Sequence, residues 1–254
     1  MDPVRPTGTL DVRGETLEYA VTGSGAPTVV LVNGAGGPLA GWGRIWAALG
    51  SRTSTFAYNR PGIGGSSKPA VPQVGSHLVS SLTALLTATQ QPPPYLMVGH
   101  SLGGLIVNLF ARTHPALVAG AVLLDATAPE DPERMAQHET RLQRLIRGML
   151  RKVSPPSPLA EIEQVITTVA EVRQAPPFPV IPLVVVTGTQ PAMQWATATE
   201  ALQARAEHQR QLVGLSPLGR QVKATRSGHF PQLSEPDLVI GAIGDVLDRV
   251  RDRG

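Results

Sequence analysis

Apolar positions along the chain follow two patterns. Short continuous apolar runs, typical of buried strands, alternate with longer stretches in which apolar residues recur at helical spacing. The runs and alternating segments predict strands at 9–13, 16–22, 29–32, 53–58, 95–98, 119–124, 182–186 and 221–225. Helical spacing predicts helices at 40–49, 76–89, 102–113 and 239–250. Strands that alternate with helices indicate an α/β fold with a mostly parallel sheet covered on both faces, which begins with a hairpin that turns at Arg13-Gly14.

Residues 126–178 interrupt this alternation with helical patterns alone. One apolar stripe comprises Leu142, Leu145, Ile146, Met149, Leu150 and Val153, and a second comprises Leu159, Ile162, Val165, Ile166 and Val169. Proline-rich segments at 155–158 and 176–179 punctuate the region. We therefore predict a core domain made of residues 1–125 and 179–254, with a small helical cap inserted at 126–178. The apolar stripes either pack on the core or line a substrate pocket.

Composition narrows the class of protein. The 254 residues, of which 42% are hydrophobic, suit one large α/β domain with a sizeable core. The chain has no uninterrupted apolar run of membrane-spanning length, and its first residues lack the apolar segment of a signal peptide, so we expect no membrane span and a cytoplasmic protein. The absence of cysteine excludes disulfides and thiolate catalysis. A net charge of only +3, without a dense basic block, argues against a nucleic-acid partner.

The strongest chemical motif is Gly99-His100-Ser101-Leu102-Gly103. It lies between the predicted strand at 95–98 and the predicted helix at 102–113, and a strand, a sharp turn and a helix would hold Ser101 at the tip with its hydroxyl exposed. Glycines at 99 and 103 would let the strand and the helix pass closely. The motif predicts that Ser101 is a nucleophile.

With this motif as its centre, the chain resembles the α/β-hydrolase superfamily, and in particular its capped serine esterases. The resemblance extends from Thr9 to Arg251 and is densest at 29–37, 58–66, 96–104 and 227–236. It implies an eight-stranded, mostly parallel sheet and a cap that covers the active site. The segment Tyr58-Asn59-Arg60-Pro61-Gly62 matches a family loop, with Asn59 in place of the usual aspartate, and we interpret this loop as structural support near the active site.

A serine hydroxyl needs a base to accept its proton, and near neutral pH an imidazole suits that role. The resemblance implies that His229 is this base, because Gly228-His229-Phe230-Pro231 follows the last predicted strand, where the family has its catalytic histidine. His100, beside the nucleophile, is assigned a structural role. The remaining histidines fit helical or surface positions, namely His77, His114, His138 and His208.

The third member of a triad should be a carboxylate that accepts a hydrogen bond from the imidazole. In many relatives it follows the strand that we predict at 182–186, but no Asp or Glu occurs between Arg173 and Thr199. An alternative known in the superfamily places the acid one strand earlier, at the end of the strand predicted at 119–124. That position is Asp125. The other candidates are Glu130 and Asp131, followed by Glu200.

A tetrahedral intermediate also needs backbone donors for its oxyanion. The amide of Leu102 is one candidate, and by resemblance the amide of Ala35, in the loop Asn33-Gly34-Ala35-Gly36-Gly37, is the other. The family often has histidine where this chain has Asn33. The same loop does not complete a dinucleotide-binding fingerprint, because Leu39 occupies the place of the third glycine. No metal and no organic cofactor is implied.

Together these residues predict a serine hydrolase that cleaves carboxylic esters through an acyl-enzyme. The partner expected is a small molecule, in particular a hydrophobic ester, because the stripes at 126–178 are apolar. Relatives with the same triad also cleave carbon–carbon bonds or lactones or carry out perhydrolysis, and these remain alternatives. A ligand-sensing protein with little turnover is a further alternative. The sequence carries no signal of the oligomeric state.

Overall fold

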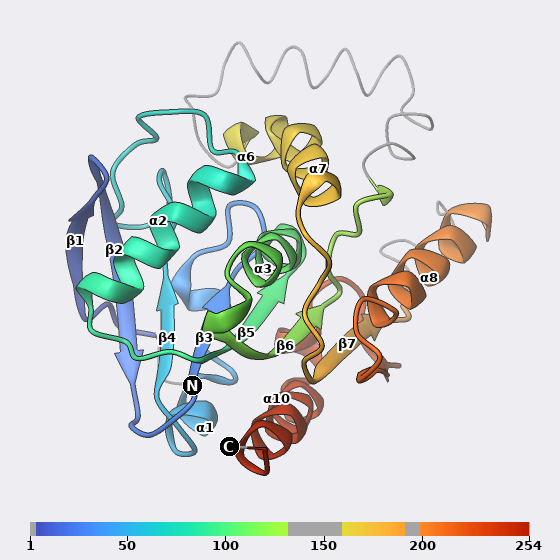
Figure 1. The fold of residues 1–254 in the computed structure, drawn as a ribbon. Helices are drawn as coiled ribbons and strands as arrows, with labels where there is room; N and C mark the ends of the chain where they lie inside the picture. Colours follow the sequence, from blue (N-terminus) through green and yellow to red (C-terminus); the bar gives the residue numbers. More distant parts are fainter. Residues whose placement is uncertain (1–3, 132–158, 191–198, 254) are drawn as a thin grey trace.

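The structure, a computed structural model, describes residues 4–131, 159–190 and 199–253. Its centre is an eight-stranded sheet in the order β1-β2-β4-β3-β5-β6-β7-β8 (Figure 1). The strands are β1 (Gly8–Val12), β2 (Glu15–Thr22), β3 (Thr28–Val32), β4 (Thr55–Tyr58), β5 (Tyr95–His100), β6 (Val118–Leu124), β7 (Leu183–Gly188) and β8 (Gly219–Ala224). β2 pairs antiparallel with both β1 and β4, and the remaining pairs are parallel. The predicted fold class is confirmed.

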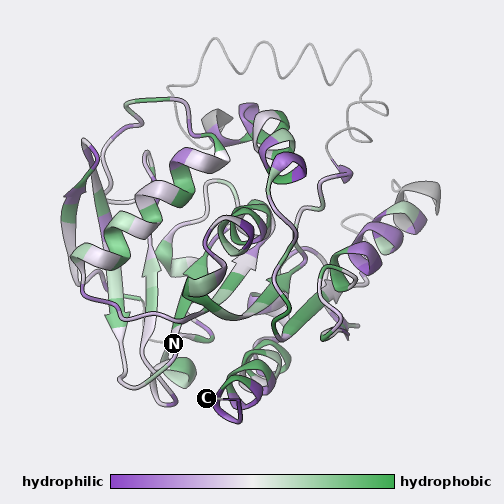
Figure 2. Cartoon of the chain, viewed as in Figure 1, coloured by the Kyte–Doolittle hydropathy of each residue, from purple (hydrophilic) through white to green (hydrophobic). Residues whose placement is uncertain are grey.

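The burial of the strands explains their sequence patterns. Every residue of β3, β4 and β5 is buried, which is why these strands are mainly apolar and do not alternate with polar residues. The central strands of the sheet include green, hydrophobic stretches (Figure 2). The outer strand β1 alternates between buried or half-buried and exposed positions, because one of its faces contacts water. Two of the loops that contain predicted site residues, those after β3 and β5, therefore start from the buried centre of the sheet.

Helices cover both faces of the sheet (Figure 1). In chain order they are η1 (Leu39–Trp42), α1 (Trp46–Gly50), α2 (Gly75–Ala88), α3 (Leu102–Thr113), η2 (Pro115–Leu117), α6 (Leu159–Glu163), α7 (Val165–Gln174), α8 (Thr199–Val213), α9 (Pro231–Ser234) and α10 (Pro236–Arg251). One hydrophobic cluster joins the sheet to α2, α3 and α7. A second cluster on the opposite face joins it to α1 and α10. The chain thus forms a three-layer sandwich.

Besides the short helices η2 and α9, which were not predicted, two longer segments differ from the sequence prediction. The helix predicted at 40–49 is split into η1 and α1, because Gly41 and Gly43 lower its helical propensity and Trp42 is buried. A Cβ at Gly41 would lie 2.8 Å from the Nδ2 atom of Asn33, so this segment approaches the loop after β3 closely. The helix α8 was not predicted, because its sequence is mainly polar and charged (Figure 2).

The second stripe of the predicted cap forms α6 and α7. The first stripe, which begins at Leu142, lies outside the described residues. α7 is fixed to the start of α2: Thr168 Oγ1 accepts from the Gly75 amide and Glu171 Oε2 accepts from the Ser76 amide, each at 2.9 Å. Val169 is buried in the core, whereas two other members of the stripe, Ile162 and Ile166, are exposed. The division into a core and a cap stays a prediction.

Among the helices of the described residues, none is long and apolar enough to cross a membrane.

Candidate active site

Ser101 occupies a strained turn between β5 and α3. Its φ of 52° and ψ of −121° lie where side-chain-bearing residues are rarely found, and such strain is maintained only when the surroundings fix it. A Cβ at Gly99 would lie 2.5 Å from the carbonyl oxygen of Gly103, and a Cβ at Gly103 would collide with the carbonyl oxygen of Val32. Both glycines therefore allow the close approach that the turn requires.

Three of the predicted side chains form a hydrogen-bonded chain. His229 Nε2 lies 3.0 Å from Ser101 Oγ, and His229 Nδ1 lies 2.7 Å from Asp125 Oδ2. Ser101, Asp125 and His229 follow β5, β6 and β8, whose carboxyl ends meet at one edge of the parallel sheet. An ionised carboxylate can only accept, so Nδ1 of His229 carries the proton and Nε2 is free to accept from the serine hydroxyl. This arrangement can activate a serine hydroxyl.

Asp125 is fixed by several donors. The Gly188 amide donates to Oδ1 at 3.2 Å, and Oδ2 accepts from both His229 and the guanidinium of Arg205. The side chain of Asp125 is fully buried. Burial alone would raise the pKa of its carboxyl, but the hydrogen bond from His229 and the positive charge of Arg205 outweigh burial and lower the pKa below its ordinary value. Asp125 is therefore ionised at neutral pH.

The other candidate acids have different partners. Asp131 Oδ2 accepts from the Ala128 amide at 2.7 Å, and Asp131 Oδ1 lies 2.6 Å from Nδ1 of His208.

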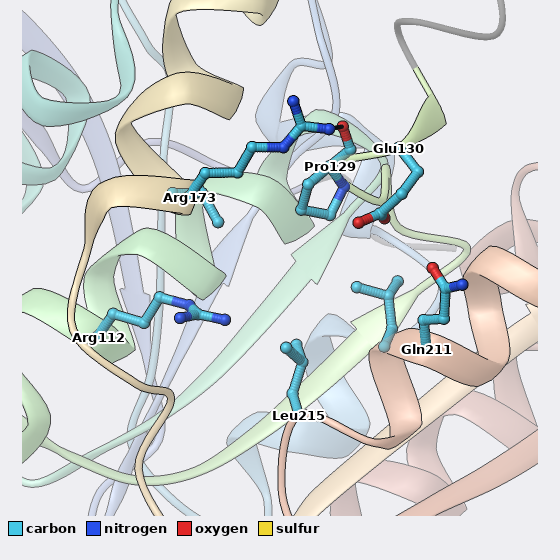
Figure 3. A pocket seen from close by; sticks show the side chains of 8 residues that line it. Arg112, Pro129, Glu130, Arg173, Gln211 and Leu215 are labelled. Atoms are coloured by element: carbon cyan, nitrogen blue, oxygen red, sulfur yellow. Dashed lines mark hydrogen bonds between the residues drawn. The ribbon is translucent and has the colours of Figure 1, made fainter.

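Glu130 lines a cavity of about 200 Å³ between α3, α7 and α8 (Figure 3). None of the residues that line this cavity is Ser101, Asp125 or His229. The side chain of Glu200 lies outside the described residues.

The loop after β3 surrounds the Ala35 amide with amides that have partners. Gly34 donates to Asn33 Oδ1 at 3.0 Å, Gly36 to Glu161 Oε2 at 3.0 Å, and Gly37 to the Gly34 carbonyl at 3.0 Å. Within the described ranges, no acceptor is found for the Ala35 amide or for the Leu102 amide at the start of α3.

The same loop lies against Ser101. A Cβ on Gly34 would lie 3.1 Å from the Cβ of Ser101, so the loop and the serine are in close contact. An anion that forms at Ser101 could therefore accept hydrogen bonds from the Ala35 and Leu102 amides, which have no other acceptor in the described part of the chain.

His100 contacts the backbone of His229. It is buried, and its Nε2 lies 2.7 Å from the carbonyl oxygen of His229. Burial lowers the pKa of His100 to about 4, so the ring is neutral at neutral pH and donates through Nε2 to that carbonyl. The rings of His100 and His229 are 4.9 Å apart between centroids. The structural role that the sequence indicated for His100 thus includes fixing the His229 loop.

Sequence reasoning missed two charged residues at this site, Arg205 on α8 and Glu161 on α6. Neither stands in a recognisable motif, and each reaches the site from a helix remote in sequence. His138 lies outside the described residues, whereas His208 lies on α8, a helical position as expected, and is buried. In the part of the chain that the structure describes, no group of three or more His, Asp or Glu side chains could hold a metal ion.

Comparisons with known proteins give a consistent picture. A family model described as alpha/beta hydrolase fold matches residues 27–158. The protein YqjL of Bacillus subtilis is 34% identical over 125 residues, which cover 47% of this chain and 49% of YqjL, so the chain spans about half the length of that relative.

Two solved structures share the architecture. An enol-lactonase from Burkholderia xenovorans LB400 has a TM-score of 0.71 at 21% identity over 95% of this chain and 100% of its own. A thermophilic esterase from Thermogutta terrifontis has a TM-score of 0.66 at 20% identity over 97% and 98% of the two chains. At these identities the likeness shows the fold alone.

Proposed function

The chain belongs to the alpha/beta hydrolase fold family, and from this premise we propose that it is a serine hydrolase that cleaves small-molecule carboxylic esters through an acyl-enzyme. One observation carries the proposal: a strained, half-buried Ser101 is hydrogen-bonded to His229, which is in turn hydrogen-bonded to the buried Asp125. A nucleophile, a base and a group that orients the base are the parts that acyl transfer requires.

The reaction begins at Ser101. His229 Nε2 takes the hydroxyl proton as Oγ attacks the ester carbonyl, and the negative charge of Asp125 stabilises the imidazolium that forms. The Ala35 and Leu102 amides donate to the oxyanion of the tetrahedral intermediate. As the intermediate collapses, His229 returns the proton to the leaving alkoxide, which departs as the alcohol.

The acyl-enzyme is then hydrolysed by the same groups. A water molecule takes the place of the alcohol, His229 accepts its proton, and the resulting hydroxide attacks the acyl carbonyl. Collapse of the second tetrahedral intermediate breaks the bond to Ser101 Oγ, which regains its proton from His229. The carboxylic acid is released and the enzyme returns to its starting state.

Lactone cleavage uses the same steps on a cyclic ester, so it belongs to the same proposal. Carbon–carbon hydrolysis and perhydrolysis are not favoured by any particular contact. Ligand sensing without turnover is disfavoured because His229 lies within hydrogen-bonding distance of both Ser101 and Asp125.

The test is hydrolysis of p-nitrophenyl esters of graded acyl length by the wild type and by Ser101→Ala, with circular dichroism to verify folding. We expect turnover that depends on Ser101, and a mass increase on Ser101 after treatment with a fluorophosphonate. Equal rates in the two proteins, or a folded wild type that neither turns over nor becomes labelled, would contradict the proposal.

A further inference from the structure

A buried ion pair joins Glu161 on α6 to Arg60 in the segment that follows β4. Arg60 Nε lies 2.5 Å from Glu161 Oε1, and Arg60 Nη2 lies 3.0 Å from Glu161 Oε2. The two side chains are 1% and 2% exposed. Two charges that are removed from water carry a large desolvation cost, which is offset only by good mutual geometry and by further hydrogen bonds. The other hydrogen bonds of the Arg60 and Glu161 side chains show which part of the molecule the pair holds in place.

In the part of the chain that the structure describes, three of these hydrogen bonds go to the loop that contains Ala35. Arg60 Nη1 donates to the carbonyl of Asn33 at 2.8 Å, and Arg60 Nη2 donates to the carbonyl of Gly34 at 2.5 Å. The other member of the ion pair also contacts the loop, because Glu161 Oε2 accepts a hydrogen bond from the Gly36 amide at 3.0 Å. The ion pair therefore contacts the loop on both sides of Ala35.

These contacts orient the Ala35 amide through the planarity of the peptide bond. The Gly34 carbonyl and the Ala35 N–H belong to one trans peptide group, in which they point in opposite directions. When Arg60 fixes that carbonyl, the Ala35 N–H must point away from Arg60. The bond from Gly36 to Glu161 fixes the next peptide group, so both peptides that flank the Ala35 Cα are held.

We propose that Glu161 is a positioning residue for the oxyanion site: with Arg60, it holds the Ala35 amide toward the oxygen that becomes negative during attack by Ser101. This inference rests on the proposed function. It also makes the helical segment that contains α6 a part of the catalytic apparatus, because the site would be incomplete without a carboxylate from that segment. A charged donor on the Gly34 carbonyl further polarises the shared peptide group and strengthens the Ala35 N–H as a donor.

The competing explanation is that Glu161 only anchors α6 to the core. The chain offers a matched control for this, because Glu171 on α7 makes a similar anchoring contact elsewhere. Glu171 Oε2 accepts from the Ser76 amide at 2.9 Å and Glu171 Oε1 accepts from the Ser76 hydroxyl at 2.5 Å, so it fixes α7 to α2 without contacting the loop. A purely anchoring role predicts the same behaviour for substitutions at both glutamates.

The experiment compares Glu161→Gln, Glu161→Asp and Glu171→Gln with the wild type. Glu161→Gln keeps the shape and removes the charge, and Glu161→Asp keeps the charge but shortens the reach to the Gly36 amide. We expect both changes at Glu161 to lower kcat for a p-nitrophenyl ester about 10- to 100-fold, with KM within about threefold, because a displaced donor weakens only transition-state binding. Fluorophosphonate labelling of Ser101 should slow in parallel. Glu171→Gln should keep its kcat while its thermal midpoint falls.

Folded Glu161 variants with kcat within twofold of the wild type would overturn the inference, as would an equal loss of kcat in Glu171→Gln. The single Glu161→Gln change leaves the buried charge of Arg60 without its carboxylate partner, which can prevent folding. In that case the double variant Arg60→Met/Glu161→Met removes both charges together and should show the same loss of kcat.

A second readout needs no turnover. The amide resonance of Ala35 in a ¹⁵N-labelled sample should shift in Glu161→Asp and stay in place in Glu171→Gln. An unmoved resonance overturns the inference even if the chain proves not to be an esterase. Loss of esterase activity in Ser101→Ala, by contrast, tests only the proposed function.

Discussion

The guanidinium of Arg205 donates a hydrogen bond to Oδ2 of Asp125, the same oxygen that accepts from Nδ1 of His229. Arg205 lies on α8, and its side chain is about one-third exposed, whereas Asp125 is fully buried. One carboxylate oxygen of Asp125 is therefore shared between the guanidinium of Arg205 and the imidazole of His229. In the proposed reaction, the guanidinium would weaken the stabilisation that Asp125 gives to a protonated imidazole.

The first prediction concerns the pH profile of Arg205→Gln. Removal of the guanidinium leaves the charge of Asp125 less neutralised, which favours protonation of the adjacent imidazole. The acidic limb of kcat/KM should therefore move to higher pH, by up to about one unit. The matched control is Arg210→Gln on the same helix, which loses only an exposed ion pair with Glu207. An acidic limb that stays in place or moves to lower pH would count against the electrostatic role of Arg205.

The second prediction separates the candidate acids. Asp125→Asn should lower kcat by about 10³- to 10⁴-fold, because an amide cannot stabilise the imidazolium and favours the wrong tautomer of His229. Asp131→Asn should retain kcat near that of the wild type, because Asp131 contacts Ala128 and His208 instead. Steady-state kinetics on one activated ester, with folding verified, is sufficient. A fast Asp125→Asn variant or a slow Asp131→Asn variant would reverse the assignment.

The part of the site that the sequence could predict consists of residues with local signals. Ser101 stands between a strand and a helix in a turn that requires glycines at 99 and 103, and His229 follows the last strand. Asp125 could be proposed because it ends a buried apolar strand, where a carboxylate needs a partner. The structure brings these three side chains together, although their catalytic roles stay predictions.

The contributions of α6 and α8 could not be predicted in the same way. Glu161 lies in a short helix, and nothing in the local sequence distinguishes it from an acidic residue on a solvated surface. Only the tertiary fold buries Glu161 against Arg60. Arg205 lies in a helix dominated by polar residues, which gave no apolar stripe. A single sequence records the spacing of residues along an element, but it does not record which distant helix approaches the site.

The third prediction follows from the buried His100. Its pKa is about 4 in the folded chain, against 6.5 ordinarily, so between these values the unfolded chain binds more protons than the folded one. The free energy of unfolding therefore falls as the pH falls from about 6.5 to about 4, by at most about 3 kcal/mol from this group. His100→Gln cannot titrate, and its stability should fall less between pH 7 and pH 4.5. Urea denaturation of both proteins at the two pH values measures this, and equal losses would refute it.

The fourth prediction uses a pair of glycines with opposite surroundings. Gly99→Ala places a Cβ 2.5 Å from the backbone oxygen of Gly103, so strand and helix must separate, and we expect a loss of about 1–3 kcal/mol in the free energy of unfolding. Gly241, within α10, has nothing within 4 Å of an added Cβ, so Gly241→Ala should stabilise the chain by up to about 1 kcal/mol through helix propensity. Thermal and urea denaturation provide the values. Separation of β5 and α3 also displaces Ser101, so Gly99→Ala should lose esterase activity while Gly241→Ala retains it. Similar activity in both variants would show that the close approach at Gly99 does not position the serine.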